Sequence, residues 1–163
     1  MLATKQPVLR RFWYPVMKLA DLDAGPRPFR LLGQDIVVWR DASGQPHSVI
    51  DRCCHRSAKL SRGFVEGDAI MCGYHGWAFD GSGACIRIPQ WKDPSRKINF
   101  RIDGFKAAAR YGYVWVCLGE PAQDIAPFPE WENSAYRKIL CGHYRLQANG
   151  PRAVENFLDV GHF

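Results

Sequence analysis

A chain of 163 residues, of which 47% are hydrophobic and 13% aromatic, is long enough to bury one substantial core, which excludes a disordered protein. The 22 Lys and Arg outnumber the 16 Asp and Glu, but they are scattered along the sequence, so nucleic acid is not an expected partner. No apolar stretch has the length of a signal peptide or a membrane span, so we expect a cytoplasmic protein without membrane contact.

The first two thirds of the chain predict short strands separated by turns. Alternating, β-branched and aromatic residues bounded by Gly, Asp, Asn, Ser or Pro are typical of antiparallel strands. We expect strands over residues 29–40, 47–50, 64–71, 77–79, 105–110 and 113–118, with turns at 41–46, 80–83 and 111–112. No glycine-rich phosphate loop is present, so the pattern predicts a mainly β sandwich or barrel.

The composition changes after Pro121, where three prolines within nine residues indicate a domain boundary. We expect one domain over residues 1–128 and the truncated beginning of a second domain over 129–163. In the second domain, residues 136–147 read as a strand. Residues 152–163 read as a helix, because a proline precedes them and an acidic residue lies in the first turns.

Two short segments combine Cys with His. Residues 53–55 are Cys-Cys-His and, after 16 intervening residues, residues 72–75 are Cys-Gly-Tyr-His. In an extended loop, residues two apart point the same way, so Cys53 and His55 are expected to face one site while Cys54 turns away.

The second segment requires a tight turn to bring Cys72 and His75 together, and Gly73 and Gly76 provide the backbone freedom. Two thiolates and two imidazoles form the donor set of a Rieske [2Fe–2S] cluster, in which two His replace two Cys on one iron. A structural zinc site is the main alternative. Zinc fingers, however, pair Cys near Cys and His near His, whereas each segment here is mixed.

Several further segments extend this pattern over most of the chain. They are Trp13-Tyr14-Pro15-Val16, Cys53-x-His55-Arg56, Leu60-Ser61-Arg62-Gly63, Gly67-Asp68, Cys72-x-Tyr74-His75-Gly76-Trp77, Phe79-Asp80-Gly81-x-Gly83 and Ile88-Pro89. With them the chain resembles the N-terminal half of Rieske non-heme iron oxygenases of the aromatic-ring-hydroxylating or O-demethylating type. The resemblance implies a mainly β fold: an antiparallel Rieske-type β-sandwich with a cluster-binding subdomain, plus the start of an α+β catalytic domain.

The resemblance also implies the ligands of the cluster. Cys53 and Cys72 would hold one iron of the [2Fe–2S] cluster, and His55 and His75 would hold the other. The aromatic residues of the second segment would pack over the cluster and exclude water.

The chain departs from the family pattern at two positions, because Cys54 and Gly73 stand where the family usually has Pro. A disulfide at Cys54 is not expected, since no thiol stands beside the second ligand segment. The remaining thiols and imidazoles are assigned to structure, the thiols as core residues: Cys85, Cys117, Cys141, His47 and His143.

The last residues, 155–163, resemble the opening of the oxygenase catalytic domain, where a helix supplies an Asp and the first iron-binding His. The resemblance implies His162 as a ligand of a mononuclear Fe(II) and Asp159 as an electron bridge to a neighbouring subunit's cluster, both on one helix face. Without the resemblance, they would be an exposed polar pair. The other His and the carboxylate of that iron would lie downstream, so residues 1–163 alone cannot complete the site.

These expectations define the partners. In the full oxygenase, a reductase or ferredoxin would reduce the cluster, which would feed the mononuclear iron of a homotrimeric enzyme that uses O₂ to hydroxylate or demethylate a small aromatic substrate. The alternatives are a free-standing Rieske ferredoxin, which has no need of the segment after residue 136, and a zinc-bound structural module.

Overall fold

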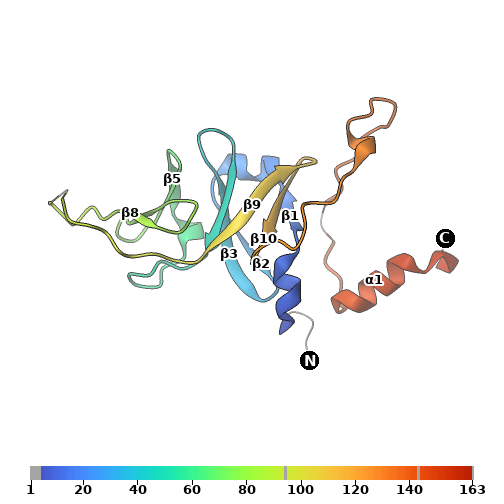
Figure 1. Ribbon diagram of the computed structural model, residues 1–163, viewed down its shortest axis with the longest axis horizontal. Helices are drawn as coiled ribbons and strands as arrows, with labels where there is room; N and C mark the ends of the chain where they lie inside the picture. The colour runs from blue at the N-terminus through green and yellow to red at the C-terminus, as the bar shows by residue number, and fades with distance from the viewer. Residues whose placement is uncertain (1–4, 94, 143, 163) are drawn as a thin grey trace.

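The computed structural model describes residues 5–93, 95–142 and 144–162, and of His162 only the backbone (Figure 1). Its regular elements in this range are mostly short antiparallel strands. The strands are β1 (Tyr14–Lys18), β2 (Arg27–Leu31), β3 (Gln34–Arg40), β4 (Pro46–Ile50), β5 (Phe64–Glu66), β6 (Ala69–Met71), β7 (Ala78–Phe79), β8 (Cys85–Arg87), β9 (Gly104–Arg110) and β10 (Tyr113–Cys117). The helical elements are α1 (Gly150–Leu158) and the 3-10 turns Pro7–Arg11, Leu19–Ala24, Leu60–Arg62, Pro129–Trp131 and Val160–His162. The predicted mainly β, antiparallel fold is confirmed.

The larger sheet has six strands in the order β1-β10-β9-β4-β3-β2, all paired antiparallel. Its strand β3 is buried on both faces, because successive side chains point to opposite sides of a sheet. Ile36 and Val38 join one hydrophobic core with β10, while Val37 and Trp39 join a second core. This explains why residues 36–39 form a continuous apolar run rather than an alternating one.

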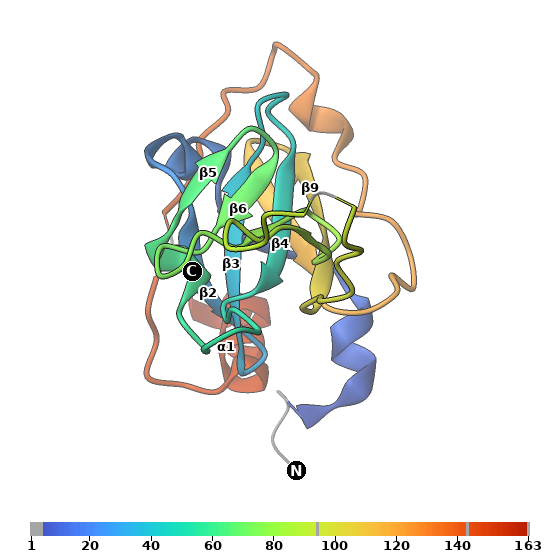
Figure 2. The same cartoon turned by 90° about the vertical axis from the view of Figure 1, so that its left-hand side faces the viewer.

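The smaller sheet has four strands in the order β5-β6-β7-β8 and packs on the second core (Figure 2). Ile70 and Phe79 from this sheet are fully buried against the Val37 and Trp39 side of β3. The indole N–H of Trp39 also donates to the carbonyl of Asp68, at 3.2 Å. Both Cys-and-His segments lie beside this smaller sheet, which is therefore the expected cluster-binding subdomain.

The predicted hairpins are present, with two additional turns. The single strand expected over 64–71 is wrong, because residues 67–68 form a turn between β5 and β6. β3 and β4 pair around the turn at 41–45, and β9 and β10 pair around Tyr111-Gly112. The single strand expected over 29–40 is wrong, because it is itself a hairpin of β2 and β3. Leu32 and Gly33 both have positive φ, +48° and +81°, as a two-residue turn of this kind requires.

The strand expected over residues 136–147 is wrong. Within the described residues of this range, the chain is irregular and exposed, with Ile139 65% and Tyr144 81% accessible. An apolar-rich segment becomes a strand only when a partner satisfies its backbone groups, and no strand of the described residues pairs with it. Across the described part of the chain, no helix combines the length and apolarity needed to cross a membrane.

The expected C-terminal helix is shorter than predicted. Asn149 is its N-cap and accepts a hydrogen bond from the Arg152 N–H at 3.0 Å, and the helix ends at Leu158. Asp159 has ψ +91°, so it lies outside α1, and a 3-10 turn follows it. Asp159 and residue 162 therefore do not share a face of one helix, and that part of the expectation is wrong.

A hydrogen bond to Asp41 holds His47 where the larger sheet meets the turn between β7 and β8, which gives His47 the structural role that the sequence predicts. His47 Nε2 lies 2.8 Å from Asp41 Oδ2, and the ring fits under the β7–β8 turn, where a Cβ on Gly81 would come 2.1 Å from His47 Nδ1. Burial alone would raise the pKa of Asp41. The hydrogen bonds from His47, Ser43 and the Gln45 N–H outweigh burial and hold the pKa well below its usual range.

We expect Asp41→Asn to lower the melting temperature above about pH 4 and to lose this effect in stronger acid. A depressed folded-state pKa contributes stability above the unfolded value of about 3.9, and that contribution is lost as the pH falls towards the folded pKa. The measurement is the difference in Tm between wild type and variant at a series of pH values, which cancels acid effects that both share. A difference that stays constant down to the lowest accessible pH would contradict the assignment.

Candidate metal centre

The first Cys-and-His segment forms a tight turn after β4. The N–H of Cys53 donates to the carbonyl of Ala58 at 2.9 Å, and the N–H of Ser57 donates back to the carbonyl of Cys53 at 2.9 Å. Ser57 has φ +59°, a left-handed conformation that is uncommon for a residue with a side chain. The expected extended loop is therefore wrong, since a turn rather than strand-like alternation directs His55.

The second segment closes in the same way after β6. The N–H of Cys72 donates to the carbonyl of Trp77 at 2.8 Å, and the N–H of Gly76 donates to the carbonyl of Cys72 at 2.9 Å. Gly76 follows Cys72 by four positions, as Ser57 follows Cys53, and it too has a positive φ, +71°. The two loops are thus twins in their backbone hydrogen bonds, although His stands two residues after Cys in one and three in the other.

The two cysteines of these loops lie buried and close to each other. Cys53 is 1% exposed and Cys72 is 2% exposed. Burial raises the pKa of the Cys53 thiol, and the neighbouring Cys72 sulfur raises it further. Buried thiols like these hold their protons until a metal cation replaces them, so they are suited to bind iron and not to act as free nucleophiles.

The two imidazoles lie together on the outer side of the loops. The ring centroids of His55 and His75 are 4.6 Å apart, and the Trp77 indole stacks on His55 at 4.7 Å with an interplanar angle of 4°. Partial desolvation, with the nearby His75 and Arg56, lowers the pKa of His55, which favours the neutral, metal-binding form. The Tyr74 ring lies 3.9 Å from that of His75, and Tyr74 keeps 65% of its surface exposed. The packing of Trp77 and Tyr74 over a cluster stays a prediction.

The donors fit a two-iron cluster because they are grouped in pairs. In a Rieske centre each iron takes two protein ligands, thiolates on one iron and imidazoles on the other. The thiols here are adjacent to each other, and so are the imidazoles. Within the described residues, no three Cys, His, Asp or Glu side chains are grouped as ligands of a single metal ion.

A close backbone approach holds the two loops together, and no local sequence pattern predicts it. A Cβ on Gly63 would lie 1.8 Å from the carbonyl oxygen of Met71, directly before Cys72. The buried carboxylate of Asp51 accepts hydrogen bonds from the Ser61 N–H and hydroxyl, both at 2.7 Å. The segment 60–63 was noted only as a family resemblance, and its tertiary contact has no signature in local sequence.

The other cysteines are placed partly as predicted, and all six are free thiols. Cys54 is exposed as a residue, although burial and the nearby Cys72 sulfur raise the pKa of its thiol. That it turns away from the site stays a prediction. Cys85 and Cys117 are core residues, 4% and 0% exposed, but Cys141 is exposed, so its assignment to the core is wrong. It lies in the irregular segment that was taken for a strand. His143 lies outside the described residues.

The glycine at position 73 acts differently from the prediction. Gly73 does not adopt a positive φ, so the turn needs the left-handed freedom only of Gly76. A Cβ at position 73 would approach the carbonyl oxygen of Arg62 to 3.1 Å, which again reflects the close approach of the two loops.

The two C-terminal candidates lie apart from these loops. Asp159 is exposed and accepts a hydrogen bond from the Gly161 N–H at 3.1 Å. His162 lies in the 3-10 turn after it, and its side chain is outside the described residues. Their roles stay predictions.

Comparison with known proteins identifies the family. Residues 12–105 match the Rieske [2Fe–2S] domain family. The chain belongs to this family. The match covers both twin loops and most of both sheets, so the family assignment rests on the region that carries all four candidate ligands.

Its relatives are components of oxygenases. It is 35% identical to the 4beta-methylsterol monooxygenase of Methylococcus capsulatus, over 93% of this chain and 43% of that protein. It is 34% identical to the methylxanthine N1-demethylase NdmA of Pseudomonas putida, over 95% of this chain and 46% of the relative. The resemblance to the Rieske non-heme iron oxygenases is confirmed. The chain spans less than half the length of these relatives.

Solved structures agree. NdmA of Pseudomonas putida CBB5 with caffeine superimposes with a TM-score of 0.90 at 33% identity, covering 98% of this chain and 48% of that one. Dicamba monooxygenase bound to dicamba superimposes with a TM-score of 0.70 at 29% identity, covering 79% of this chain and 40% of that one. The Rieske-type fold is thus shared with oxygenases. In NdmA, the similarity covers 98% of this chain and so extends well beyond residue 105.

Proposed function

We propose that this chain transfers single electrons through a Rieske [2Fe–2S] cluster bound by Cys53, Cys72, His55 and His75, and that it delivers them to the mononuclear iron of an oxygenase. The observation that carries this proposal is the pair of twin loops, which group two buried thiols beside two stacked imidazoles. When bound, the cluster supplies a one-electron redox centre whose potential the two neutral imidazole ligands raise.

The residues of the chain have separate tasks in this function. Cys53 and Cys72, which are buried, would hold one iron, and burial would exclude water from their thiolates. His55 and His75, whose rings lie together, would hold the other iron. Trp77 stacks on His55 and thereby restricts the orientation of its ring.

A free-standing Rieske ferredoxin is the alternative, and the extent of the similarity disfavours it. The 4beta-methylsterol monooxygenase and NdmA align with 93% to 98% of this chain, well beyond residue 105. We therefore infer that residues 1–128 form the cluster domain and that residues 129–163 begin the catalytic domain. There, His162 would provide one ligand of the mononuclear Fe(II) and Asp159 the electron bridge, in a homotrimer.

The same relatives guide the proposed reaction and partners. A reductase or ferredoxin would supply the electrons. The relatives' names include a methylxanthine demethylase and a dehydrodivanillate O-demethylase. A small aromatic compound is therefore the proposed substrate, with hydroxylation or demethylation as the proposed reaction.

The test is the electron paramagnetic resonance spectrum of the purified protein after reduction by dithionite. We expect a rhombic signal, equal amounts of iron and inorganic sulfide, and a reduction potential of about −150 mV or higher, the range typical of Rieske centres. A plant-type cluster, with four Cys ligands, would lie near about −400 mV. Colourless protein that contains zinc and no inorganic sulfide would overturn the proposal.

A further inference from the structure

The positive charge of the protein is concentrated at the end that carries the twin loops. Residues 52–101 build this end (Figure 1), and they contain nine Lys and Arg and four Asp and Glu, whereas the rest of the chain contains 13 Lys and Arg and 12 Asp and Glu. Eight of the nine basic residues lie in the segments 52–62 and 89–101, where Asp93 is the one acidic residue. The basic residues are scattered in the sequence, but the fold brings these eight to one end of the molecule.

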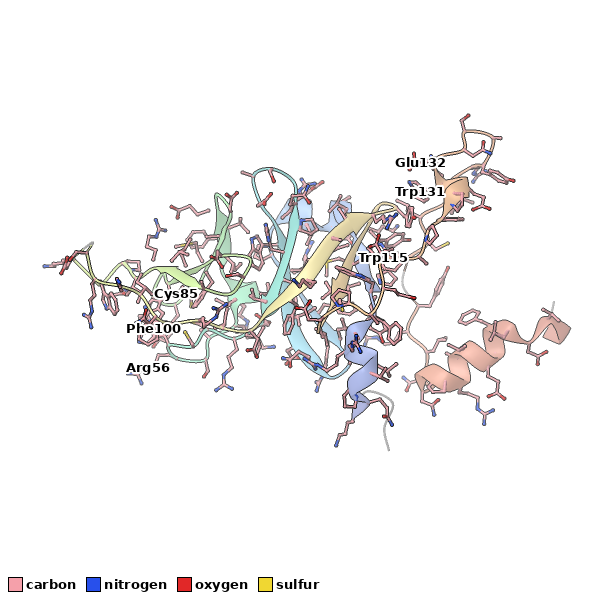
Figure 3. The ribbon with its side chains drawn as sticks, viewed as in Figure 1. Arg56, Cys85, Phe100, Trp115, Trp131 and Glu132 are labelled. Carbon is pink, nitrogen blue, oxygen red and sulfur yellow. The ribbon has the colours of Figure 1, made fainter. Side chains whose placement is uncertain are left out.

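These eight side chains form what we call the basic tip. They are Arg52, Arg56, Lys59, Arg62, Lys92, Arg96, Lys97 and Arg101, and all are exposed. Figure 3 places Arg56 near Phe100 and Cys85 at one end of the molecule, with Trp131 and Glu132 at the other end.

The basic tip differs from the other basic residues in its lack of counter-charge. Arg30, Arg40, Arg87, Arg110 and Arg152 each form an ion pair with a carboxylate. Within the part of the chain that the structure describes, no member of the basic tip forms one. Exposed like charges that no carboxylate neutralises repel one another, and the binding of an acidic partner relieves this repulsion.

An aromatic path connects this surface to a proposed cluster ligand. His55 stacks on Trp77, the Trp77 ring lies 5.1 Å from that of Phe100, and Phe100 lies 6.2 Å from Trp91. Phe100 is 46% exposed, and the guanidinium of Arg96 lies 3.8 Å above the Trp91 ring. The centre of the basic tip is therefore apolar and packed directly against the cluster site, with charge around it, which is the usual anatomy of a protein interface.

We propose that the basic tip is the docking surface for an acidic electron-donor protein. The proposal rests on the proposed function and specifies its partner. Opposite charges would steer the donor to the tip, and Phe100 and Trp91 would form the apolar contact next to His55. Contacts of this electron-transfer type are small and short-lived, so charge governs mainly the rate of association.

The test is a stopped-flow measurement of cluster reduction by an acidic plant-type [2Fe–2S] ferredoxin, using the purified full chain. For wild type, we expect the second-order rate constant to fall about tenfold or more between about 0.01 M and about 1 M salt, as the Debye length shortens from about 30 Å to about 3 Å. At low salt, Lys92→Glu with Lys97→Glu is expected to slow reduction about tenfold. These two lysines are exposed, and their replacement leaves the Arg96–Trp91 contact in place.

Two controls separate docking from damage. Arg137→Glu with Arg145→Glu makes the same change in net charge on exposed residues of the C-terminal segment, and we expect it to leave the rate within about twofold of wild type. Reduction by the methyl viologen radical, a small cation, is expected not to slow in the Lys92 and Lys97 variant. A slower reaction with both reductants would mean a damaged cluster site, and the proposal would then be tested with Arg56→Gln in the same two assays.

The remaining outcomes are distinguishable. A normal rhombic signal, with a ferredoxin rate that depends on neither salt nor the Lys92 and Lys97 substitutions, overturns the docking surface and leaves the proposed function intact. Absence of the signal overturns the proposed function itself. Single-stranded oligonucleotides and phosphatidylserine vesicles are tested as competitors of the ferredoxin. If either displaces the ferredoxin and binds more strongly than it does, the proposal of a protein partner is overturned in favour of a polyanion or a membrane.

Discussion

Replacing His75 by alanine is expected to abolish the rhombic signal and to reduce inorganic sulfide in the purified protein to near zero. The substitution removes one of two adjacent imidazoles and leaves an iron with an incomplete set of protein ligands. Cys53→Ser is expected to have the same effect, because a buried hydroxyl at this position is a much weaker ligand than a thiolate for iron bridged by sulfide. The measurement is iron and sulfide per chain, with the visible spectrum.

The chain contains a matched control for each substitution. Cys54→Ser changes the thiol directly beside Cys53, but Cys54 is exposed, so the cluster is expected to remain. His47→Ala removes a histidine that binds Asp41 at 2.8 Å, so stability is expected to fall while the sulfide content per folded chain is unchanged. Loss of the cluster in Cys54→Ser and its retention in Cys53→Ser would exchange the two roles and refute the ligand set.

The parts of this fold that the sequence predicted are those set by neighbouring residues. Turn residues such as Tyr111-Gly112 specify a hairpin locally, and β9 and β10 pair around them as expected. The grouping of Cys53 with His55 was also predictable, since only one or two residues separate each Cys from its His. A tight turn, and not the expected extended loop, forms the first of these segments.

The parts that the sequence did not predict depend on contacts between distant residues. Residues 136–147 have the composition of a strand, yet a strand requires a partner, and composition carries no information about partners. The basic tip likewise cannot be recognised from the sequence, because its members Arg56 and Lys97 are 41 residues apart in the chain. The left-handed conformation of Ser57 could have been anticipated only by aligning the first loop with the second, in which glycine takes that position.

We expect Gly63→Ala to destabilise the cluster domain by about 3 kcal/mol, through a steric conflict that no side chain can relieve. A Cβ at this position would lie 1.8 Å from the backbone oxygen of Met71, so the contact involves two backbones rather than a flexible side chain. Either the turn at 60–63 or β6 has to move, and β6 leads directly into Cys72. For a chain of this size, each kcal/mol lowers the melting temperature by about 2 to 4 °C.

Gly142→Ala is the matched control, because a Cβ there meets nothing within 4 Å. Its Tm is expected to stay within about 2 °C of wild type, since an exposed substitution of this kind changes stability by about 0.5 kcal/mol or less. The measurements are Tm by circular dichroism and sulfide content per chain. If Gly63→Ala melts like wild type and keeps its cluster, the twin loops do not need this close approach. If it loses the cluster while Cys54→Ser keeps it, the backbone contact between Gly63 and Met71 positions Cys72, and the separation of the two loops, as well as the identity of the four ligands, determines whether the site can form.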